Sequence, residues 1–360
     1  MSGSTSASYN VAIGNNAGAA MTTGDLYNTL VGHGAGASIT SGNRNVFMGT
    51  SAGDGHDTET HNLGIGVASL GGSIAGGEYN VAVGNYTLDA LTSGDFNVAL
   101  GYNALTANQT GGNCTAVGYL AGEDNTAHEL TAFGSKAAMN NTSGGGITAI
   151  GREAYNNADT ENHNTAIGLN SIGGAVNGGE YNVAIGNYTG QALTSGDNNV
   201  FLGYQAGVNQ TTANSNTIIG YIAGKELTTG GENVIIGNSA VDTGVMTALY
   251  SVIIGKDAGR NKTSGSNCIF IGYQSGEQVT SGQNNIFMGS NAGDDFDTEG
   301  SNIGIGSSAL GGAIAGGEQN VAIGHDSLDA LTSADACTAV GHEAGSAVTT
   351  GGINTFVGQR

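Results

Sequence analysis

The acidic side chains that could hold a metal ion occur in three similar loops. Each loop reads Asp-Thr-Glu, at residues 57–59, 159–161 and 297–299. Carboxylate oxygens in glycine-containing loops suit Ca²⁺. The spacing, however, matches neither an EF-hand loop nor the nonapeptide of calcium-binding β-rolls. We therefore expect a solvated acidic belt, with no metal and no cofactor; the weak candidate ligands are Asp57, Glu59, Asp159, Glu161, Asp297 and Glu299.

The residue types used for catalysis are present but not arranged for it. The seven histidines fall at different positions with no common partner, and no Gly-x-Ser-x-Gly turn joins a strand to a helix. Residues 32–36 superficially resemble a dinucleotide-binding loop but lack the helix that must follow. Cys114, Cys268 and Cys337 are too few and too far apart for a disulfide framework or a zinc site. The sequence predicts no enzyme and three small buried cysteines.

Composition excludes several classes of partner. The chain has 360 residues, 66 of them Gly, no Pro, and 8 Lys and Arg against 29 Asp and Glu, for a net charge of −21. Nucleic acids and anionic membranes need positive charge, so neither is an expected partner. No apolar run is long enough to insert into a membrane, and no signal peptide is visible at the start. The absence of a signal peptide favours a virion protein or an export signal located elsewhere.

One short motif, first seen as residues 10–14 (Asn-Val-Ala-Ile-Gly), organises the whole chain. Its glycine recurs at 21 places from Gly14 to Gly358, about 17 residues apart. The apolar residues before the glycine are β-branched and alternating, and the polar runs between motifs are rich in turn formers. No segment shows helical periodicity. The repeat predicts an all-β parallel β-solenoid of about 21 coils, forming one continuous domain over residues 1–360.

Residue volumes indicate which side chains fill the coil. We number columns from the motif glycine, so that column −1 is the residue before it. A large residue in column −2 goes with glycine in column +4, as in Phe201 and Gly207, whereas Ala99 goes with Leu105. Volumes that compensate in this way indicate two columns that face each other in a packed interior. The predicted core residues are Phe201, Ile218, Ile235, Ile253, Phe270, Phe287 and Leu105.

Columns −3 and −1 then point out of the coil, because successive strand side chains alternate between faces. Both columns carry Val, Ile, Thr and other apolar residues along the whole chain. An outward apolar ladder of this length far exceeds the patch that a monomer usually exposes. We expect it to pack against copies of itself in a closed homo-oligomer. The predicted interface residues include Val81, Val83, Val98, Ile167, Val183, Ile185, Val234, Ile236 and Ile254.

A longer duplication lies on top of the short repeat. Residues 45–95 match residues 285–335 closely at a shift of 240 positions, and a weaker third copy covers residues 159–197. Copying of whole segments fits a shaft that has been lengthened by duplication.

The motif resembles two families of trimeric fibre. The Asn-x-Val-Ala-Ile-Gly units are similar to the head repeats of YadA-type trimeric autotransporter adhesins. Residues 97–105 (Asn-Val-Ala-Leu-Gly-Tyr-Asn-Ala-Leu) are closer to the shaft repeats found upstream of endosialidase-type chaperone domains in phage tail fibres. The resemblance covers nearly the whole chain and implies a homotrimeric, left-handed β-roll. The repeats are longer than typical head repeats, and no coiled-coil stalk, anchor barrel or chaperone domain is seen.

These observations predict a structural fibre shaft. The leading expectation is a phage tail or virion fibre that positions a receptor-binding tip for host attachment. The alternatives are a bacterial trimeric surface adhesin and a self-assembling extracellular filament. In each case the location is extracellular, and the expected partners are its own copies, other fibre or tail proteins at the ends, and a host receptor or glycan.

Overall fold

The computed structural model describes residues 6–73, 75–312 and 316–360. By compactness the chain divides into two units, Met1–Glu180 and Tyr181–Arg360. Both units are parallel β-solenoids, and together they contain about 20 turns spaced about 17 residues apart. The predicted all-β parallel solenoid is therefore confirmed, whereas the left-handed β-roll, the homotrimer and the single continuous domain stay predictions. No helix in the described part of the chain has the length and apolar character needed to cross a membrane.

Every strand has three residues. The first unit contains β1 (Ser6–Ser8), β2 (Val11–Ile13), β3 (Thr23–Asp25), β4 (Thr29–Val31), β5 (Val46–Met48), β6 (Leu63–Ile65), β7 (Val81–Val83), β8 (Val98–Leu100), β9 (Thr115–Val117), β10 (Thr131–Phe133), β11 (Thr148–Ile150) and β12 (Thr165–Ile167). The second unit contains β13 (Val183–Ile185), β14 (Val200–Leu202), β15 (Thr217–Ile219), β16 (Val234–Ile236), β17 (Val252–Ile254), β18 (Ile269–Ile271), β19 (Ile286–Met288), β20 (Ile303–Ile305), β21 (Val321–Ile323), β22 (Thr338–Val340) and β23 (Thr355–Val357).

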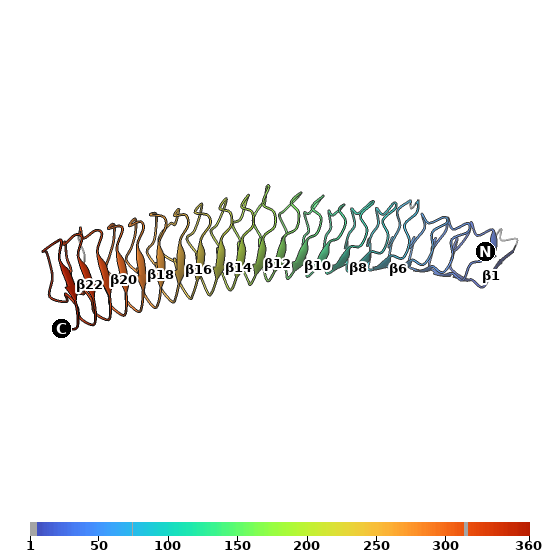
Figure 1. Cartoon of the computed structure of the whole chain (residues 1–360). Coiled ribbons are helices and arrows are strands. Elements are labelled where there is room, and N and C mark those ends of the chain that lie inside the picture. Colours follow the sequence, from blue (N-terminus) through green and yellow to red (C-terminus); the bar gives the residue numbers. More distant parts are fainter. Residues whose placement is uncertain (1–5, 74, 313–315) are drawn as a thin grey trace. The chain divides into compact units, whose positions relative to one another are not determined.

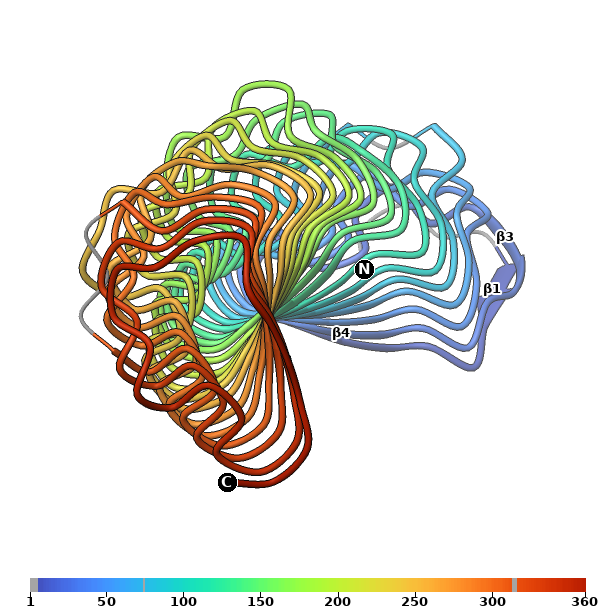
Figure 2. The same cartoon turned by 60° about the vertical axis from the view of Figure 1, so that its left-hand side comes forward.

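Within each unit the motif strands of successive coils pair in parallel. Between β8 and β9, Val98 lies opposite Thr115 and Leu100 opposite Val117. Each residue therefore lies beside the residue of the same column in the next coil. Figure 1 shows these strands side by side within each unit, and Figure 2 shows neighbouring coils overlying one another.

Four columns of each coil have a positive φ, and these residues make the turns. In the coil of Gly101 they are Phe96 (58°), Gly101 (128°), Asn103 (54°) and Leu105 (52°). At the motif position only glycine fits. A Cβ on Gly101 would lie 2.3 Å from the carbonyl oxygen of Gly118 in the next coil, and a φ of this size is essentially restricted to glycine. This close approach explains why the motif glycine does not vary along the chain.

The coil interior contains columns −2 and +4, and they meet there. Phe201 and Phe270 are fully buried. A Cβ added to Gly207 would lie 2.6 Å from the Phe201 ring, and one added to Gly276 would lie 3.0 Å from the Phe270 ring. Leu105 is also fully buried at a φ of 52°, so the backbone of column +4 accepts a side chain where column −2 is small. The remaining predicted core residues are also fully buried: Ile218, Ile235, Ile253 and Phe287.

A third interior column, +7, was not predicted. It holds apolar residues such as Leu91 and Leu193, and it also holds buried polar residues such as Asn108 and Gln210. Because these residue types are mixed and lie within a polar stretch of sequence, no alternation marks the column. Column +7 completes the packing of the interior beside columns −2 and +4.

A spine of buried asparagines runs through column −4. The backbone N–H of Asn97 donates to Oδ1 of Asn80 in the preceding coil (2.9 Å), and Nδ2 of Asn97 donates to the carbonyl of Gly111 (2.9 Å). Where cysteine replaces asparagine, the N–H of Cys114 donates to Oδ1 of Asn97 and its Sγ lies 3.3 Å from the carbonyl of Ala127. The three cysteines are free and buried, as expected.

Candidate functional site: an exposed apolar face and its two edges

The outward face of the motif strands is the largest apolar surface that the repeat creates. Along most strands the middle residue is buried, the first is half-buried and the last is half-buried or exposed. In column −1, Leu100 is 37% exposed and Leu202 is 42% exposed. The face therefore carries two parallel files of side chains in contact with solvent in the isolated chain, which we call the aliphatic files. Column −1 is apolar throughout, and column −3 is aliphatic except where it is Thr, as in β9 to β12.

The predicted interface residues all lie on this face. Ile185 is 37% exposed, and the others are half-buried: Val81, Val83, Val98, Ile167, Val183, Val234, Ile236 and Ile254. Part of their surface is covered by the same column of neighbouring coils. Their role as contacts between subunits stays a prediction.

Two turns bound the face. Column −5 precedes the strand and has a φ near 58°, and the motif glycine follows the strand with a φ near 135°. We call column −5 the leading edge and columns +1 and +2 the trailing edge. Side chains on these two edges flank the aliphatic files and were not singled out from the sequence.

The leading edge of the first unit carries stacked planar side chains. Tyr79 lies between His61, at 4.8 Å between ring centroids, and Phe96, at 5.2 Å, with nearly parallel planes. Arg44 extends the series, with Nη1 3.5 Å from Nε2 of His61. Tyr79 is 46% exposed and Phe96 is 57% exposed. We call Arg44, His61, Tyr79 and Phe96 the ridge.

The trailing edge carries tyrosines in the same coils. Tyr86, Tyr102 and Tyr119 follow one another with ring centroids 5.9 Å apart at each step. Tyr102 and Tyr119 are 46% and 51% exposed. We call these three residues the tyrosine file. Tyrosine and phenylalanine are enriched in protein contact surfaces relative to the rest of a protein surface.

The acidic loops are built differently from the expectation. Glu59 is only 3% exposed. Its Oε2 accepts the backbone N–H of Asp57 (2.8 Å) and of Thr58 (3.1 Å), and its Oε1 accepts the N–H of Gly76 in the next coil (3.1 Å). The glutamate thus closes its own turn and ties it to the neighbouring coil.

The same arrangement occurs in the other two loops. Glu161 and Glu299 are 2% and 7% exposed, and each accepts three equivalent backbone N–H groups. The prediction of a solvated belt was wrong for these three glutamates, because backbone donors bind their carboxylates inside the turns. Only Asp57, Asp159 and Asp297 face solvent, each accepting a threonine hydroxyl from the preceding coil.

The expectation that the histidines fall at different positions was wrong for some of them. His325 and His342 both occupy column +1 and stack at 5.2 Å between ring centroids. Nδ1 of His325 also lies 2.8 Å from Oδ2 of Asp326 on the surface. Over residues 6–73, 75–312 and 316–360, no three His, Cys, Asp or Glu side chains are close enough to hold a metal ion.

Two basic side chains are buried in column +7. His56 has no accessible surface, and neither ring nitrogen has a hydrogen-bond partner; burial lowers its pKa to about 3 and keeps it neutral. The ring packs against Phe47 at 4.7 Å. Lys262 is equally buried, donates to the carbonyl of Gly282 (2.6 Å), and has its pKa lowered by burial. Both groups are isolated from the surface and therefore cannot act on a ligand.

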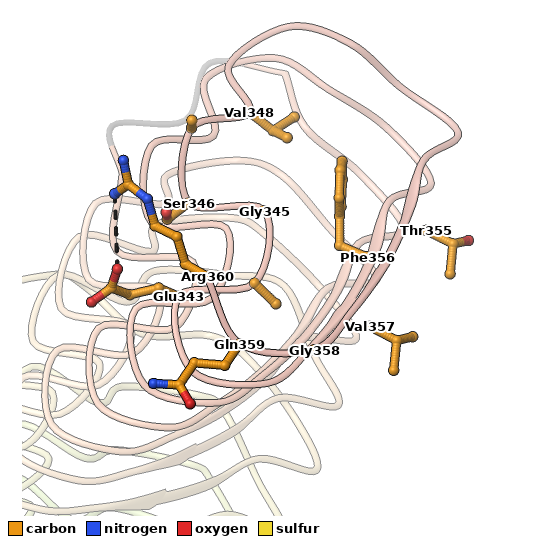
Figure 3. Close-up of a pocket in the computed structure, with 12 residues that line it drawn as sticks. Glu343, Gly345, Ser346, Val348, Thr355, Phe356, Val357, Gly358, Gln359 and Arg360 are labelled. Carbon is orange, nitrogen blue, oxygen red and sulfur yellow. Dashed lines mark ion pairs between the residues drawn. The ribbon is translucent and has the colours of Figure 1, made fainter.

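A hollow of about 490 Å³ opens at the last coil. Val348 and Phe356 line it from columns that are buried in earlier coils, and Arg360 crosses its rim to Glu343, with Nη1 3.8 Å from Oε2 (Figure 3). The hollow is thus the open end of the interior columns. It brings together no group of residues suited to catalysis.

Neither models of known protein families nor functionally characterised proteins give a match to this chain.

Proposed function

We propose that this protein is the shaft of a homotrimeric fibre, a left-handed β-roll that positions a receptor-binding tip for host attachment. The observation that carries the proposal is the outward apolar face, whose aliphatic files run along both units. Two further copies would cover this face and remove its apolar surface from water. Such burial stabilises the assembly by about 25 cal/mol per Å² of apolar area. The leading assignment is a phage tail or virion fibre. The alternatives are a bacterial surface adhesin and an extracellular filament.

The uniformity of the coils supports a mechanical role. Side chains fill the interior columns, and the glutamates of the acidic loops accept hydrogen bonds from backbone N–H groups. His56 and Lys262 are buried and cannot contact a ligand in solvent. In such a shaft, stiffness comes from the hydrogen-bonded spine and the packed columns. Recognition of a host receptor or glycan, and of other fibre or tail proteins, then belongs to other parts of the assembly.

The oligomeric state is tested by light scattering and native mass spectrometry on the purified chain. The expected mass is three times 35.5 kDa. Replacing Leu100 and Leu202 together by Asp should give smaller species, because charges cannot be buried unpaired at the centre of an interface. A stable monomer of the natural sequence at micromolar concentration would contradict the trimer.

The biological assignment is tested by immunogold electron microscopy with antibodies against the purified chain. Labelling of fibres on virus particles supports the leading assignment. Labelling confined to a cell surface supports the adhesin instead, and labelling of free filaments supports the third alternative.

A further inference from the structure

The apolar face alone does not define how two copies align. Its coils repeat every 17 residues or so, column −1 is apolar in every coil, and column −3 is Val, Ile, Leu or the similarly shaped Thr. A neighbouring copy displaced by one coil would therefore meet almost the same surface. Periodic contact surfaces need a non-periodic feature to fix one register.

The two edges of the first unit provide such a feature. In the coil of Gly84, Tyr79 lies on the leading edge and Tyr86 on the trailing edge. In the next coil the corresponding pair is Phe96 and Tyr102. Aromatic side chains therefore occupy both rims of the face at the same two levels.

The duplicated segment shows that folding does not require them. At a shift of 240 residues, Tyr79 and Tyr86 become Gln319 and Asp326. Phe96 and Tyr102, just beyond the duplicated residues 45–95, correspond to Ala336 and His342. The coil of Gly84 keeps its interior, because Ala82 and Leu88 correspond to Ala322 and Leu328. The coil of Gly101 does not, because Leu105 corresponds to Gly345. The leading edge therefore loses its aromatic side chains while the fold stays the same, and the trailing edge exchanges tyrosines for the stacked imidazoles of His325 and His342. Differences at the edges of equivalent coils are expected if the edges serve another contact rather than the coil.

Charges on the two edges are complementary at another level. Glu129 is exposed on the leading edge, and Lys136 lies on the trailing edge of the same coil. Neither forms an ion pair within the residues that the structure describes. Glu129 borders a hollow of about 370 Å³ that is lined by His128, Gly145 and Gly146. Gly146 occupies column −5 of the next coil, and the His163 ring lies beside it, with Nδ1 2.6 Å from where a Cβ of Gly146 would be.

From these edges we infer that copies of this chain pack side by side, parallel and in register, with the leading edge of one against the trailing edge of the next. The ridge then meets the tyrosine file of the neighbour, and Glu129 meets the neighbour's Lys136 at the hollow. Three-fold cyclic symmetry requires such a contact between two different edges. The inference rests on the proposed trimer and adds its orientation, its register and the residues that set them.

The test is disulfide trapping between engineered cysteines. Glu129→Cys with Lys136→Cys should give a covalent trimer on a non-reducing gel. A bond within one chain is excluded because β10 separates the two sites by about 10 Å at 3.3 Å per residue, beyond the reach of a disulfide. Glu129→Cys with Glu153→Cys is the matched control, since Glu153 occupies the column of Lys136 one coil further on. The natural cysteines are buried and do not interfere.

The ridge is tested in the natural sequence by replacing each of its residues with the one 240 positions further along the chain. The changes are Arg44→Asn, His61→Ser, Tyr79→Gln and Phe96→Ala. We expect subunits to exchange between isotopically light and heavy trimers at least about tenfold faster, equivalent to about 1.4 kcal/mol. The one-coil-shifted cysteine pair should also begin to cross-link. The control is Tyr250→Gln, which removes an exposed tyrosine from the same column of the second unit.

The outcomes separate the two proposals. If the natural chain is monomeric, the trimeric fibre itself is wrong. If it is trimeric but the shifted pair cross-links as well as the aligned pair, the register is wrong while the fibre stands. A ridge variant that exchanges as slowly as the natural chain would overturn the role of the ridge.

Discussion

Residues 45–95 and residues 285–335 form the same series of coils, and they differ in where their sequences have diverged. Inside, Phe47 and Phe287 occupy column −2 of equivalent coils, and Glu59 and Glu299 accept the same three backbone N–H groups. On the edges of the face, aromatic residues in one copy are polar or small in the other. The comparison teaches that turns and interior specify the coil, whereas the edges are free to carry function.

One large interior side chain departs from this rule. His56 in the first copy corresponds to Phe296 in the second, and both rings pack against the phenylalanine of column −2, at 4.7 Å and 5.0 Å between centroids. Phe296 fills the space with apolar atoms. His56 leaves two buried nitrogens without partners, which costs free energy that a phenylalanine does not.

The largest expected effect is the loss of a column −2 ring. Phe47→Ala and Phe287→Ala should each lower the free energy of unfolding by roughly 3–5 kcal/mol, because each opens a cavity in a fully buried site. The measurement is denaturant unfolding. Unequal losses, differing by more than about 2 kcal/mol, would contradict the equivalence of the two interiors.

A second substitution tests whether a larger side chain in column +4 compensates for the loss of the ring in column −2. A Cβ on Gly53 would lie 2.4 Å from the Phe47 ring, so Gly53→Leu alone should destabilise by overpacking. Combined with Phe47→Ala, it recreates the pair that Ala99 and Leu105 already form. The double variant should recover about 1 kcal/mol or more relative to additivity. Strictly additive losses would mean that the two columns do not pack against each other.

A smaller effect is expected at the glutamates that close the acidic turns. Glu59→Gln and Glu299→Gln should each cost about 1–3 kcal/mol, because an amide places N–H groups against the backbone donors that the carboxylate now accepts. Thermal melts with and without a chelator provide the control. A midpoint that falls on addition of the chelator would show that these loops depend on a bound cation instead.

The smallest effect near neutral pH is that of His56→Phe, and it grows in acid. The folded pKa of His56 is about 3 and its ordinary value is 6.5, so between these values the unfolded chain binds a proton that the folded chain does not. Stability should therefore fall as the pH drops below 6.5, by at most about 1.4 kcal/mol per unit from this group. His56→Phe should flatten that part of the profile. The same slope in both proteins would exclude His56 as its source.

The interior that could be predicted is the part that alternates in sequence. Volume exchange between columns −2 and +4 identified Phe201 and Leu105 as core because each large residue has a small partner at fixed spacing. Column +7 escaped because Asn108, Lys262 and Leu193 share burial but no residue type. Their common environment comes from stacking, which a single coil does not reveal.

Of the candidate site, the aliphatic files could be predicted from the sequence, whereas the side chains on the leading and trailing edges could not. The aliphatic files follow from strand alternation, whereas the ridge occupies a turn position where any residue that tolerates a positive φ is accepted. Planar side chains in successive coils are 16–18 residues apart in sequence, and they become neighbours only once the coils stack. The buried state of Glu59 was missed for a related reason, since its third donor, Gly76, lies in another coil.

The asparagine spine also bears on how the length of such a protein can change. Asparagines in widely separated coils make the same two hydrogen bonds, as Asn97 and Asn233 do. Removing or inserting a whole number of coils would bring two equivalent partners together and restore both bonds. Recombination between the two duplicated gene segments would do this in a single event. Length can then evolve in discrete steps without any change to the rules by which a coil folds.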